Sequence, residues 1–203
     1  MTAIIDYGVG NLFSLRSSFS AIGEKAVVSS DPEVLASADR LVLPGVGAFR
    51  DARKALDDSG LVCSVLDLVK NGKPMLGICL GMQLLFDKDY EDGEYDGLGL
   101  IPGAVRSIAE TIPADLKVPQ IGWNALIYRN PSRLYRYIRE GDHVYFVHSY
   151  HATGCEAYTT AVTEYGGMLT ASVENGNVFG TQFHPEKSGD VGLRILRAFV
   201  EMK

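Results

Sequence analysis

Cysteine is scarce in this sequence of 203 residues: Cys63, Cys79 and Cys155 are the only three, and their spacing fits no disulfide framework. The N-terminus also lacks the charged segment and apolar run of a secretory signal. We therefore expect reduced thiols and a cytoplasmic protein. No apolar run approaches the roughly 20 residues that a membrane-spanning helix needs, so we expect no membrane association.

Positive charge is also limited. The formal net charge is −6 and no basic stripe is present, which argues against a nucleic-acid partner. Neither C-x-x-C nor H-E-x-x-H spacing occurs, so we expect no metal and no other cofactor. With 46% hydrophobic and 22% charged residues, the composition is that of a globular protein. The length fits one sizeable core, and we expect a single domain over residues 1–203.

The first half of the chain alternates between strand-like and helix-like segments, which favours βαβ units and a mostly parallel sheet. Asp31 and Pro32 are a typical helix start, an N-cap acid followed by proline at the first helical position. The expected strands are 2–5, 25–29, 40–43 and 75–78. The expected helices are 12–22, one that starts at Pro32, 50–58, 61–70 and the apolar segment after residue 79.

The second half has a different pattern, because strand-like segments follow one another closely through short links that contain Gly and Asn. These links suggest antiparallel additions to the sheet. We expect strands at 103–109, 119–128, 143–150, 158–164, 168–174 and 177–183. Ser188 can cap a final amphipathic helix over residues 189–201. The acidic, glycine-containing segment 87–96 is expected to be an exposed loop.

The most informative stretch is P-M-L-G-I-C-L-G-M-Q-L-L-F, Pro74–Phe86, which places Cys79 between Gly77 and Gly81. An apolar strand before Cys79 and a helix after it form a corner that projects the side chain out of the sheet. Glycines two residues away on either side let neighbouring backbone pass closely. N–H dipoles at a helix start also favour a thiolate. Cys79 is therefore the candidate nucleophile of covalent acyl chemistry.

A cysteine nucleophile needs a base, and the base needs a group that orients it. His184 lies in F-H-P-E at the end of a predicted strand, two residues before Glu186. On an extended backbone these two side chains project to the same side. Glu186 can then accept a hydrogen bond from one imidazole nitrogen while the other nitrogen faces the thiol. Because such groups gather at the carboxyl ends of strands in open α/β sheets, we expect His184 close to Cys79.

Acyl transfer also needs donors for the developing oxyanion. One candidate is the backbone N–H of Leu80, the residue after the nucleophile. A second comes from P-G-V-G, Pro44–Gly47, where glycine lets the peptides at Val46 and Gly47 turn an N–H toward the reacting carbonyl. Losing one such donor typically costs on the order of 3 kcal/mol of transition-state stabilisation.

The other cysteines and histidines have structural interpretations. Cys63 and Cys155 are read as small buried hydrophobes. His143 and His151 are read as core or surface residues of strands, and the same interpretation is held less firmly for His148. Pro44–Gly47, considered alone, could be only a turn.

The residues G-I-C-L-G-M-Q around Cys79 and F-H-P-E ending at Glu186 resemble the nucleophile and base signatures of the class I glutamine amidotransferases. Four further motifs resemble the glutaminase subunits of imidazole glycerol phosphate synthases, and the likeness covers essentially the whole chain. These motifs are D-Y-G-V-G-N at Asp6–Asn11, L-P-G-V-G-A-F at Leu43–Phe49, G-W-N at Gly122–Asn124 and Y-F-V-H-S-Y at Tyr145–Tyr150.

The resemblance implies an α/β fold of three layers, flavodoxin-like, with a mostly parallel sheet and antiparallel additions. It implies hydrolysis of glutamine to glutamate and ammonia. The ammonia would pass to a (β/α)8-barrel cyclase subunit, in a heterodimer that makes imidazole glycerol phosphate and aminoimidazole carboxamide ribonucleotide for histidine biosynthesis. Low activity of the isolated subunit is also implied, and reorientation of the glycine-rich Pro44–Gly47 peptides would explain it.

The resemblance also implies residue roles. Cys79 would be the nucleophile, His184 the general base and acid, and Glu186 the orienting carboxylate. The glutamine pocket would include Gly47, Gln83, Ser149 and Tyr150, and the interface with the cyclase would include Asn11, Trp123 and Lys187. From the residues alone, Gln83 could equally face solvent, Trp123 could belong to the core, and Lys187 could be an ordinary solvated charge.

Three other functions remain open at this point. The chain could feed ammonia to another synthase, for example one that makes pyridoxal phosphate or a nucleotide, although D-Y-G-V-G-N and G-W-N argue against this. It could be a thiol hydrolase or peptidase on a related sheet. It could also be an inactive binding or regulatory subunit, but the intact Cys79, His184 and Glu186 argue against that interpretation.

Overall fold

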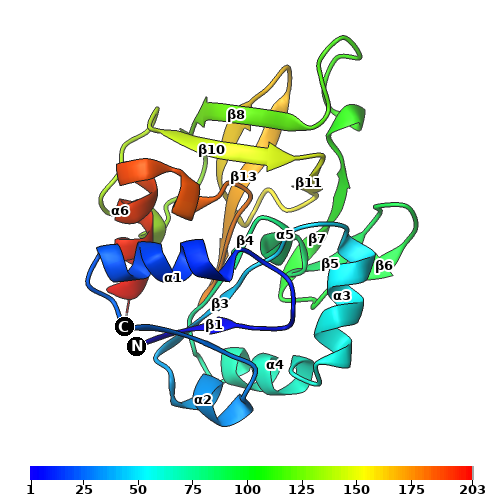
Figure 1. The fold of residues 1–203 in the computed structure, drawn as a ribbon. Coiled ribbons are helices and arrows are strands. Elements are labelled where there is room, and N and C mark those ends of the chain that lie inside the picture. Colours follow the sequence, from blue (N-terminus) through cyan, green and yellow to red (C-terminus); the bar gives the residue numbers. More distant parts are fainter. Residues whose placement is uncertain (203) are drawn as a thin grey trace.

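The computed structural model describes residues 1–202, which form three β-sheets with helices packed around the largest (Figure 1). This sheet has eight strands in the order β2-β1-β3-β4-β14-β13-β12-β9. The first five are parallel and follow the order of flavodoxin-like sheets, which confirms the predicted fold class. Their bounds are β1 Thr2–Ile5, β2 Ala26–Ser29, β3 Arg40–Leu43, β4 Met75–Ile78 and β14 Val178–Thr181.

Only some of the later strands extend this sheet. Three strands continue it in antiparallel fashion, as predicted: β13 Met168–Asn175, β12 Thr159–Glu164 and β9 Ile127–Tyr128. The expectation that the other strands also join it is wrong. Two of them form a separate antiparallel pair, β10 His143–His148 and β8 Gln120–Ala125. A third sheet has the order β11-β7-β5-β6, with bounds β11 Tyr150–Thr153, β7 Ile101–Ser107, β5 Phe86–Asp89 and β6 Tyr95–Asp96.

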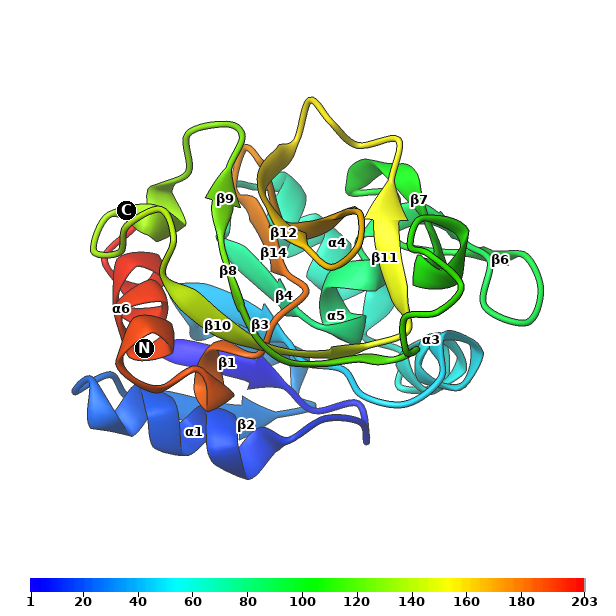
Figure 2. The same cartoon turned by 90° about the horizontal axis from the view of Figure 1, so that it is seen from above.

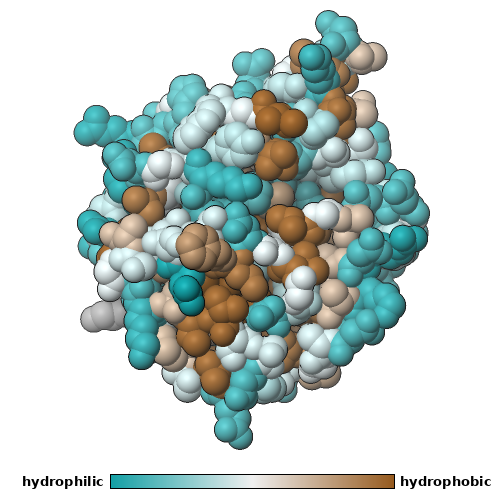
Figure 3. Space-filling view, viewed as in Figure 1, coloured by the Kyte–Doolittle hydropathy of each residue, from teal (hydrophilic) through white to brown (hydrophobic). Residues whose placement is uncertain are grey.

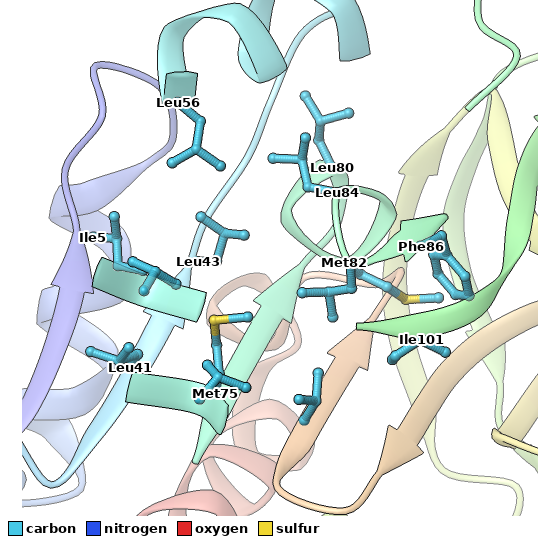
Figure 4. Packing of buried hydrophobic residues seen from close by; sticks show 14 of the residues in the cluster. Ile5, Leu41, Leu43, Leu56, Met75, Leu80, Met82, Leu84, Phe86 and Ile101 are labelled. Carbon is cyan, nitrogen blue, oxygen red and sulfur yellow. The ribbon is translucent and has the colours of Figure 1, made fainter. Parts of the chain in front are cut away.

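Helices cover both faces of the parallel sheet, as the two separate apolar clusters show. On one face Leu41 and Met75 pack with Leu56 from α3 (Figure 4). Leu35 from α2 belongs to the same cluster. On the other face Leu76 packs with side chains of α1 and α6, which Figure 2 shows together beside β1 and β10. The helix bounds are α1 Leu12–Ala21, α2 Pro32–Ser37, α3 Phe49–Asp58, α4 Val62–Lys70, α5 Leu80–Gln83 and α6 Gly189–Val200. None of the helices in residues 1–202 is long and apolar enough to cross a membrane.

The predicted helix after Cys79 is present as α5, which has four residues. Other local expectations are wrong. The segment 87–96, expected to be an exposed loop, contributes to β5 and β6. Strand formation here depends on pairing with β7, which no local pattern reveals. Asp89 in this segment is fully buried. The predicted strand 143–150 is interrupted at Ser149, where the chain leaves the β8–β10 pair for the third sheet.

The space-filling view shows apolar side chains gathered into patches on one face of the molecule (Figure 3). Six large hydrophobic side chains are exposed within the described residues: Phe13, Val46, Val118, Ile121, Trp123 and Met168. Two of them, Ile121 and Trp123, lie on β8. Exposed apolar patches often mark surfaces that bind another protein.

Candidate active site

Cys79 occupies a strained corner directly after β4. Its φ of 55° and ψ of −114° lie in a region that residues other than glycine rarely adopt. Glycine is required on both sides of the corner. A Cβ on Gly77 would lie 2.6 Å from the carbonyl oxygen of Gly81, and a Cβ on Gly81 would lie 1.9 Å from the carbonyl oxygen of Leu43. The predicted reason for the G-x-C-x-G pattern is therefore confirmed.

The strand beside β4 carries His184 to the same edge of the sheet. β4 and β14 are parallel neighbours, and the backbone N–H of Cys79 donates to the carbonyl oxygen of Thr181 at 2.7 Å. His184 follows three residues after Thr181 and lines the same cavity as Cys79. The side-chain amide of Gln182 donates to the sulfur of Cys79 at 3.7 Å. The expected meeting of the two side chains at the carboxyl ends of the strands is thus observed.

His184 and Glu186 form a buried pair. Nδ1 of His184 donates to Oε1 of Glu186 at 2.7 Å, and the two side chains are only 3% and 2% exposed. The backbone differs from the extended one expected, because residues Pro185–Lys187 form a 3-10 turn. The prediction that the side chain of Ser188 caps α6 is wrong, although Ser188 is the N-cap residue. Its hydroxyl donates to the carbonyl oxygen of His184 at 2.6 Å and fixes this turn instead.

Two histidines at the cavity have opposite electrostatic environments. Burial acts to lower the pKa of His184, but hydrogen bonding and charge interactions with Cys79 and Glu186 outweigh it and raise this pKa to about 9. Burial lowers the pKa of His148 to about 4, and the bond of its Nδ1 to the carbonyl oxygen of Tyr150 offsets this only in part. His184 therefore retains a proton at neutral pH, while His148 is neutral.

The glycine-rich segment after β3 lies against the corner. A Cβ on Gly45 would be 2.5 Å from the backbone nitrogen of Gly81, so this close approach also requires glycine. Gly47 has a φ of 90° and open space around it. Leu80 begins α5, and the first N–H groups of a helix have no acceptor within it. Backbone donors from both segments thus lie close to the thiol.

The cavity beside Cys79 has a volume of about 360 Å³. Every residue predicted for the catalytic centre except Glu186 lines this cavity. Every residue predicted for the oxyanion hole and the substrate pocket lines it as well. Its lining is Val46, Gly47, Cys79, Leu80, Gln83, Glu91, Pro119, Val147, His148, Ser149, Tyr150, His184 and Lys187. Within residues 1–202, no group of three or more His, Cys, Asp and Glu side chains is arranged to hold a metal ion.

Gln83 faces this cavity and not solvent. Its side chain is 5% exposed, and its Nε2 donates to the carbonyl oxygen of Tyr150 and to Oε1 of Gln182, both at 3.1 Å. Since Gln182 also donates to the sulfur of Cys79, the amides of Gln83 and Gln182 link the thiol to β11. The one-turn spacing from Cys79 to Gln83 was the signal that made this position predictable.

Four lining residues were not predicted: Glu91, Pro119, Val147 and His148. The sequence supports a structural interpretation of His148 only weakly. Its position within Y-F-V-H-S-Y is the signal that could have placed it at the site. Glu91 had no such signal, because the segment that carries it was interpreted as an exposed loop. Glu91 lines the cavity, and the carboxylate of Glu186 holds His184.

The residues predicted at a partner interface lie in three different settings. Asn11 is the N-cap of α1, and its side chain accepts from the backbone N–H of Ser14 at 3.3 Å. Trp123 is 53% exposed on β8, so it does not belong to the core. Lys187 is one of the residues that line the cavity.

The remaining cysteines and histidines lie elsewhere. Cys155 is buried, but Cys63 is exposed on α4, so its interpretation as a buried hydrophobe is wrong. His143 is exposed at the start of β10. His151 is buried beside a second cavity of about 560 Å³, where it lies 3.0 Å from the hydroxyl of Thr111. These observations agree with structural roles for both histidines.

Comparisons with known proteins agree with this geometry. Residues 3–202 match the family model described as glutamine amidotransferase class-I. The chain is 47% identical over 206 residues to the imidazole glycerol phosphate synthase subunit HisH of Syntrophotalea carbinolica, covering 100% of each. It is 50% identical to the HisH subunit of Geobacillus kaustophilus, covering 98% of this chain and 96% of that one.

A solved structure described as a glutamine amidotransferase shares the fold. Its TM-score is 0.76 at 20% sequence identity, and the likeness covers 98% of this chain and 97% of that one. The full-length matches and the shared fold lead to one assignment. The chain belongs to the class I glutamine amidotransferases, within the family of HisH subunits of imidazole glycerol phosphate synthase.

Proposed function

We propose that the cavity hydrolyses the side-chain amide of glutamine and that the whole chain acts as one amidotransferase domain. The observation that carries this proposal is the buried His184–Glu186 pair beside Cys79 in a single cavity. A thiolate, a protonated imidazole and an orienting carboxylate are the groups that cysteine-dependent acyl transfer needs.

In the first step, the thiolate of Cys79, formed with His184 as the imidazolium, attacks the amide carbon of glutamine and forms a tetrahedral intermediate. The N–H of Leu80 and an N–H of the segment at Val46 and Gly47 stabilise its oxyanion. His184 gives its proton to the departing nitrogen, the C–N bond breaks, and ammonia leaves a γ-glutamyl thioester on Cys79. The pKa of His184, raised to about 9, keeps the proton available for this transfer at neutral pH.

In the second step, His184, now neutral, takes a proton from water as the water oxygen attacks the thioester carbonyl. The C–S bond then breaks, and glutamate leaves with the sulfur restored. Glu186 holds Nδ1–H of His184 throughout, so that Nε2 remains directed to the reacting atoms.

The rest of the cavity supports recognition of a free amino acid. Lys187 and Glu91 provide a cation and an anion at the cavity, which suit the α-carboxylate and the α-ammonium group of glutamine. Gln83, Ser149 and Tyr150 provide polar contacts and shape. A cavity of about 360 Å³ is of the size that small-molecule sites have.

A partner that uses the ammonia is part of the proposal. The names of the HisH relatives describe subunits of imidazole glycerol phosphate synthase. We propose that this chain likewise forms a heterodimer with a (β/α)8-barrel cyclase subunit, in the cytoplasm, and supplies histidine biosynthesis with nitrogen. Exposed Trp123 on β8 and Asn11 at the start of α1 are the proposed contacts, with Lys187 at the edge between the cavity and the partner.

The experiment that tests the proposal is Cys79→Ala in the complex with the cyclase. We expect loss of glutamine-dependent synthesis with synthesis from added ammonium salts largely unchanged, because only the glutaminase step needs the thiol. Loss of both activities would assign Cys79 a structural role. Cys63→Ala, which removes an exposed thiol on α4, is the matched control and should leave both activities unchanged.

We propose that the Pro44–Gly47 peptides must reorient before they donate to the oxyanion. The isolated chain should therefore hydrolyse glutamine slowly. The open space at Gly47 permits such a change. The measurement is the glutaminase rate with and without the cyclase and its nucleotide ligand. Equal rates would show that the oxyanion donors are already in place in the isolated chain.

A further inference from the structure

The segment between β3 and α3 is held at its two ends by side chains from distant parts of the sequence. At the first end, the hydroxyl of Tyr7 donates to the carbonyl oxygen of Pro44 at 2.7 Å. At the other end, the backbone N–H of Phe49 donates to Oε2 of Glu91 at 2.6 Å. Between these anchors lies Gly47 with open space around it. The anchors therefore determine where the peptides between them can point.

The anchor at Phe49 compensates for a missing helix cap. Ala48 is the N-cap residue of α3 and has no side chain that could accept a hydrogen bond. Glu91 reaches this helix end from the loop between β5 and β6, which lies beside α3 in Figures 1 and 2. A carboxylate at a helix N-terminus is favourable because the N–H groups there carry partial positive charge.

Glu91 is itself held in position. Its backbone N–H donates at 2.7 Å to Oδ1 of Asp89, a side chain that is fully buried at the end of β5. Glu91 also lines the catalytic cavity together with Gly47 and Tyr150. Its Oε2 binds Phe49, and within residues 1–202 no hydrogen bond involves its Oε1. The same carboxylate can therefore meet a ligand in the cavity and the helix start that follows the glycine-rich segment.

We propose that Glu91 is a positioning residue that connects the bound amino acid to the Gly45–Gly47 peptides through the N–H of Phe49. This inference rests on the proposed function, because it takes the ligand of the cavity to be glutamine. When the α-ammonium group of the ligand binds Oε1, the carboxylate becomes fixed, and so does the N–H of Phe49 on Oε2. A ligand that fills the cavity thereby fixes the position of one end of the segment between β3 and α3, whose peptides donate to the oxyanion.

The proposal separates two properties of Glu91, its charge and its reach. Glu91→Gln keeps an amide oxygen that can accept from Phe49 but removes the charge that attracts an ammonium group. We expect KM for glutamine to rise about 10-fold with kcat within about threefold, because a charged hydrogen bond is lost from ligand binding. Glu91→Asp keeps the charge but is shorter by one methylene. It should lower kcat about 10-fold or more, with the smaller change in KM.

The measurement is kcat and KM of glutamine hydrolysis in the complex with the cyclase and its nucleotide ligand, accompanied by thermal unfolding of each variant. Glu94→Gln and Glu94→Asp are matched controls, since Glu94 lies in the same loop and its carboxylate pairs with Lys88 at the surface. Both controls should match the wild type. Glu91→Ala should combine the two defects, and the Gln and Asp variants decide the question even where the Ala variant is unstable.

Two results would overturn the inference. One is equal kcat values for Glu91→Asp and wild type, which would show that reach to Phe49 has no catalytic effect. The other is a fall in kcat for Glu91→Gln as large as that for Glu91→Asp, which would show that reach to Phe49 does not by itself account for the loss of kcat. A wild-type complex that does not hydrolyse glutamine would instead refute the proposed function, so the two failures are distinguishable.

Discussion

Glu186→Gln tests how the buried carboxylate controls His184. The variant keeps an oxygen that can accept from Nδ1–H, now 2.7 Å from Oε1, but removes the negative charge. Because both side chains are almost fully buried, solvent screens this charge very little. Burial alone would lower the pKa of His184, so Cys79 and Glu186 together hold it at about 9. Removing the negative charge of Glu186 should therefore lower the pKa of His184.

The expected size of the effect follows from the strength of the bond. A hydrogen bond to a charged group contributes about 1.5–3 kcal/mol, roughly twice as much as a neutral one, so the variant loses about 1–2 kcal/mol of imidazolium stabilisation. At 1.36 kcal/mol per pH unit, the pKa of His184 should fall by about one pH unit. If the same stabilisation acts on the imidazolium formed during catalysis, kcat should fall about 5- to 30-fold.

The assay is a pH titration of the imidazole resonances by NMR, with glutamine hydrolysis measured on the same proteins. The signal of His184 is assigned by its loss in His184→Gln. Glu33→Gln, an exposed change in the first turn of α2, is the control and should alter neither quantity. An unchanged pKa of His184 together with an unchanged kcat in Glu186→Gln would refute the reasoning that this carboxylate holds the proton on the imidazole.

Two further predictions concern stability. Burial raises the pKa of Asp89 from 3.8 to about 6, so ionising this side chain disfavours the folded state: stability is fullest below about pH 4 and falls as the pH rises through 6. Asp89→Asn can still accept from the backbone N–H of Glu91. In urea denaturation its free energy of unfolding should therefore exceed that of the wild type by up to about 3 kcal/mol at pH 8, and the difference should vanish near pH 4. A constant difference across this range would contradict the assignment. Gly81→Ala should destabilise the fold by more than about 3 kcal/mol, because its Cβ would lie 1.9 Å from the carbonyl oxygen of Leu43. Gly23→Ala, with open space but a φ of 80°, should cost about 1 kcal/mol in the same measurement, and a loss for Gly81→Ala no larger than this would contradict the crowding argument.

The parallel half of the fold could be predicted because its signals are local. Alternating apolar segments and a helix start at Asp31 and Pro32 gave β1 to β4 and α1 to α4 within one or two residues. The distribution of later strands among three sheets could not be predicted in this way, because it depends on which distant strand each one pairs with. The break at Ser149 shows this, since the residues on both sides have strand character but join different sheets.

The residues of the candidate site differ in the same way, since some are indicated by local motifs and others depend on distant contacts. Cys79 and the pair His184 and Glu186 lie in compact motifs whose spacing carries the chemistry, so their meeting could be expected. Glu91 enters the cavity from a loop between two short strands, and nothing in its neighbours along the chain indicates this position. Its contact with Phe49 spans 42 residues and exists only once the third sheet has packed against α3.

The pairing of β4 with β14 has a consequence for synthesis of the chain. Val178 pairs with Met75, so the strand that carries the nucleophile is completed about half a chain length after it is made. Until then one edge of β4 is open, and an open apolar edge invites pairing with other chains. The proposed base of Cys79 is also absent during this interval, because His184 follows β14. A growing chain therefore cannot consume glutamine before nearly all of it has been made and the parallel sheet has closed.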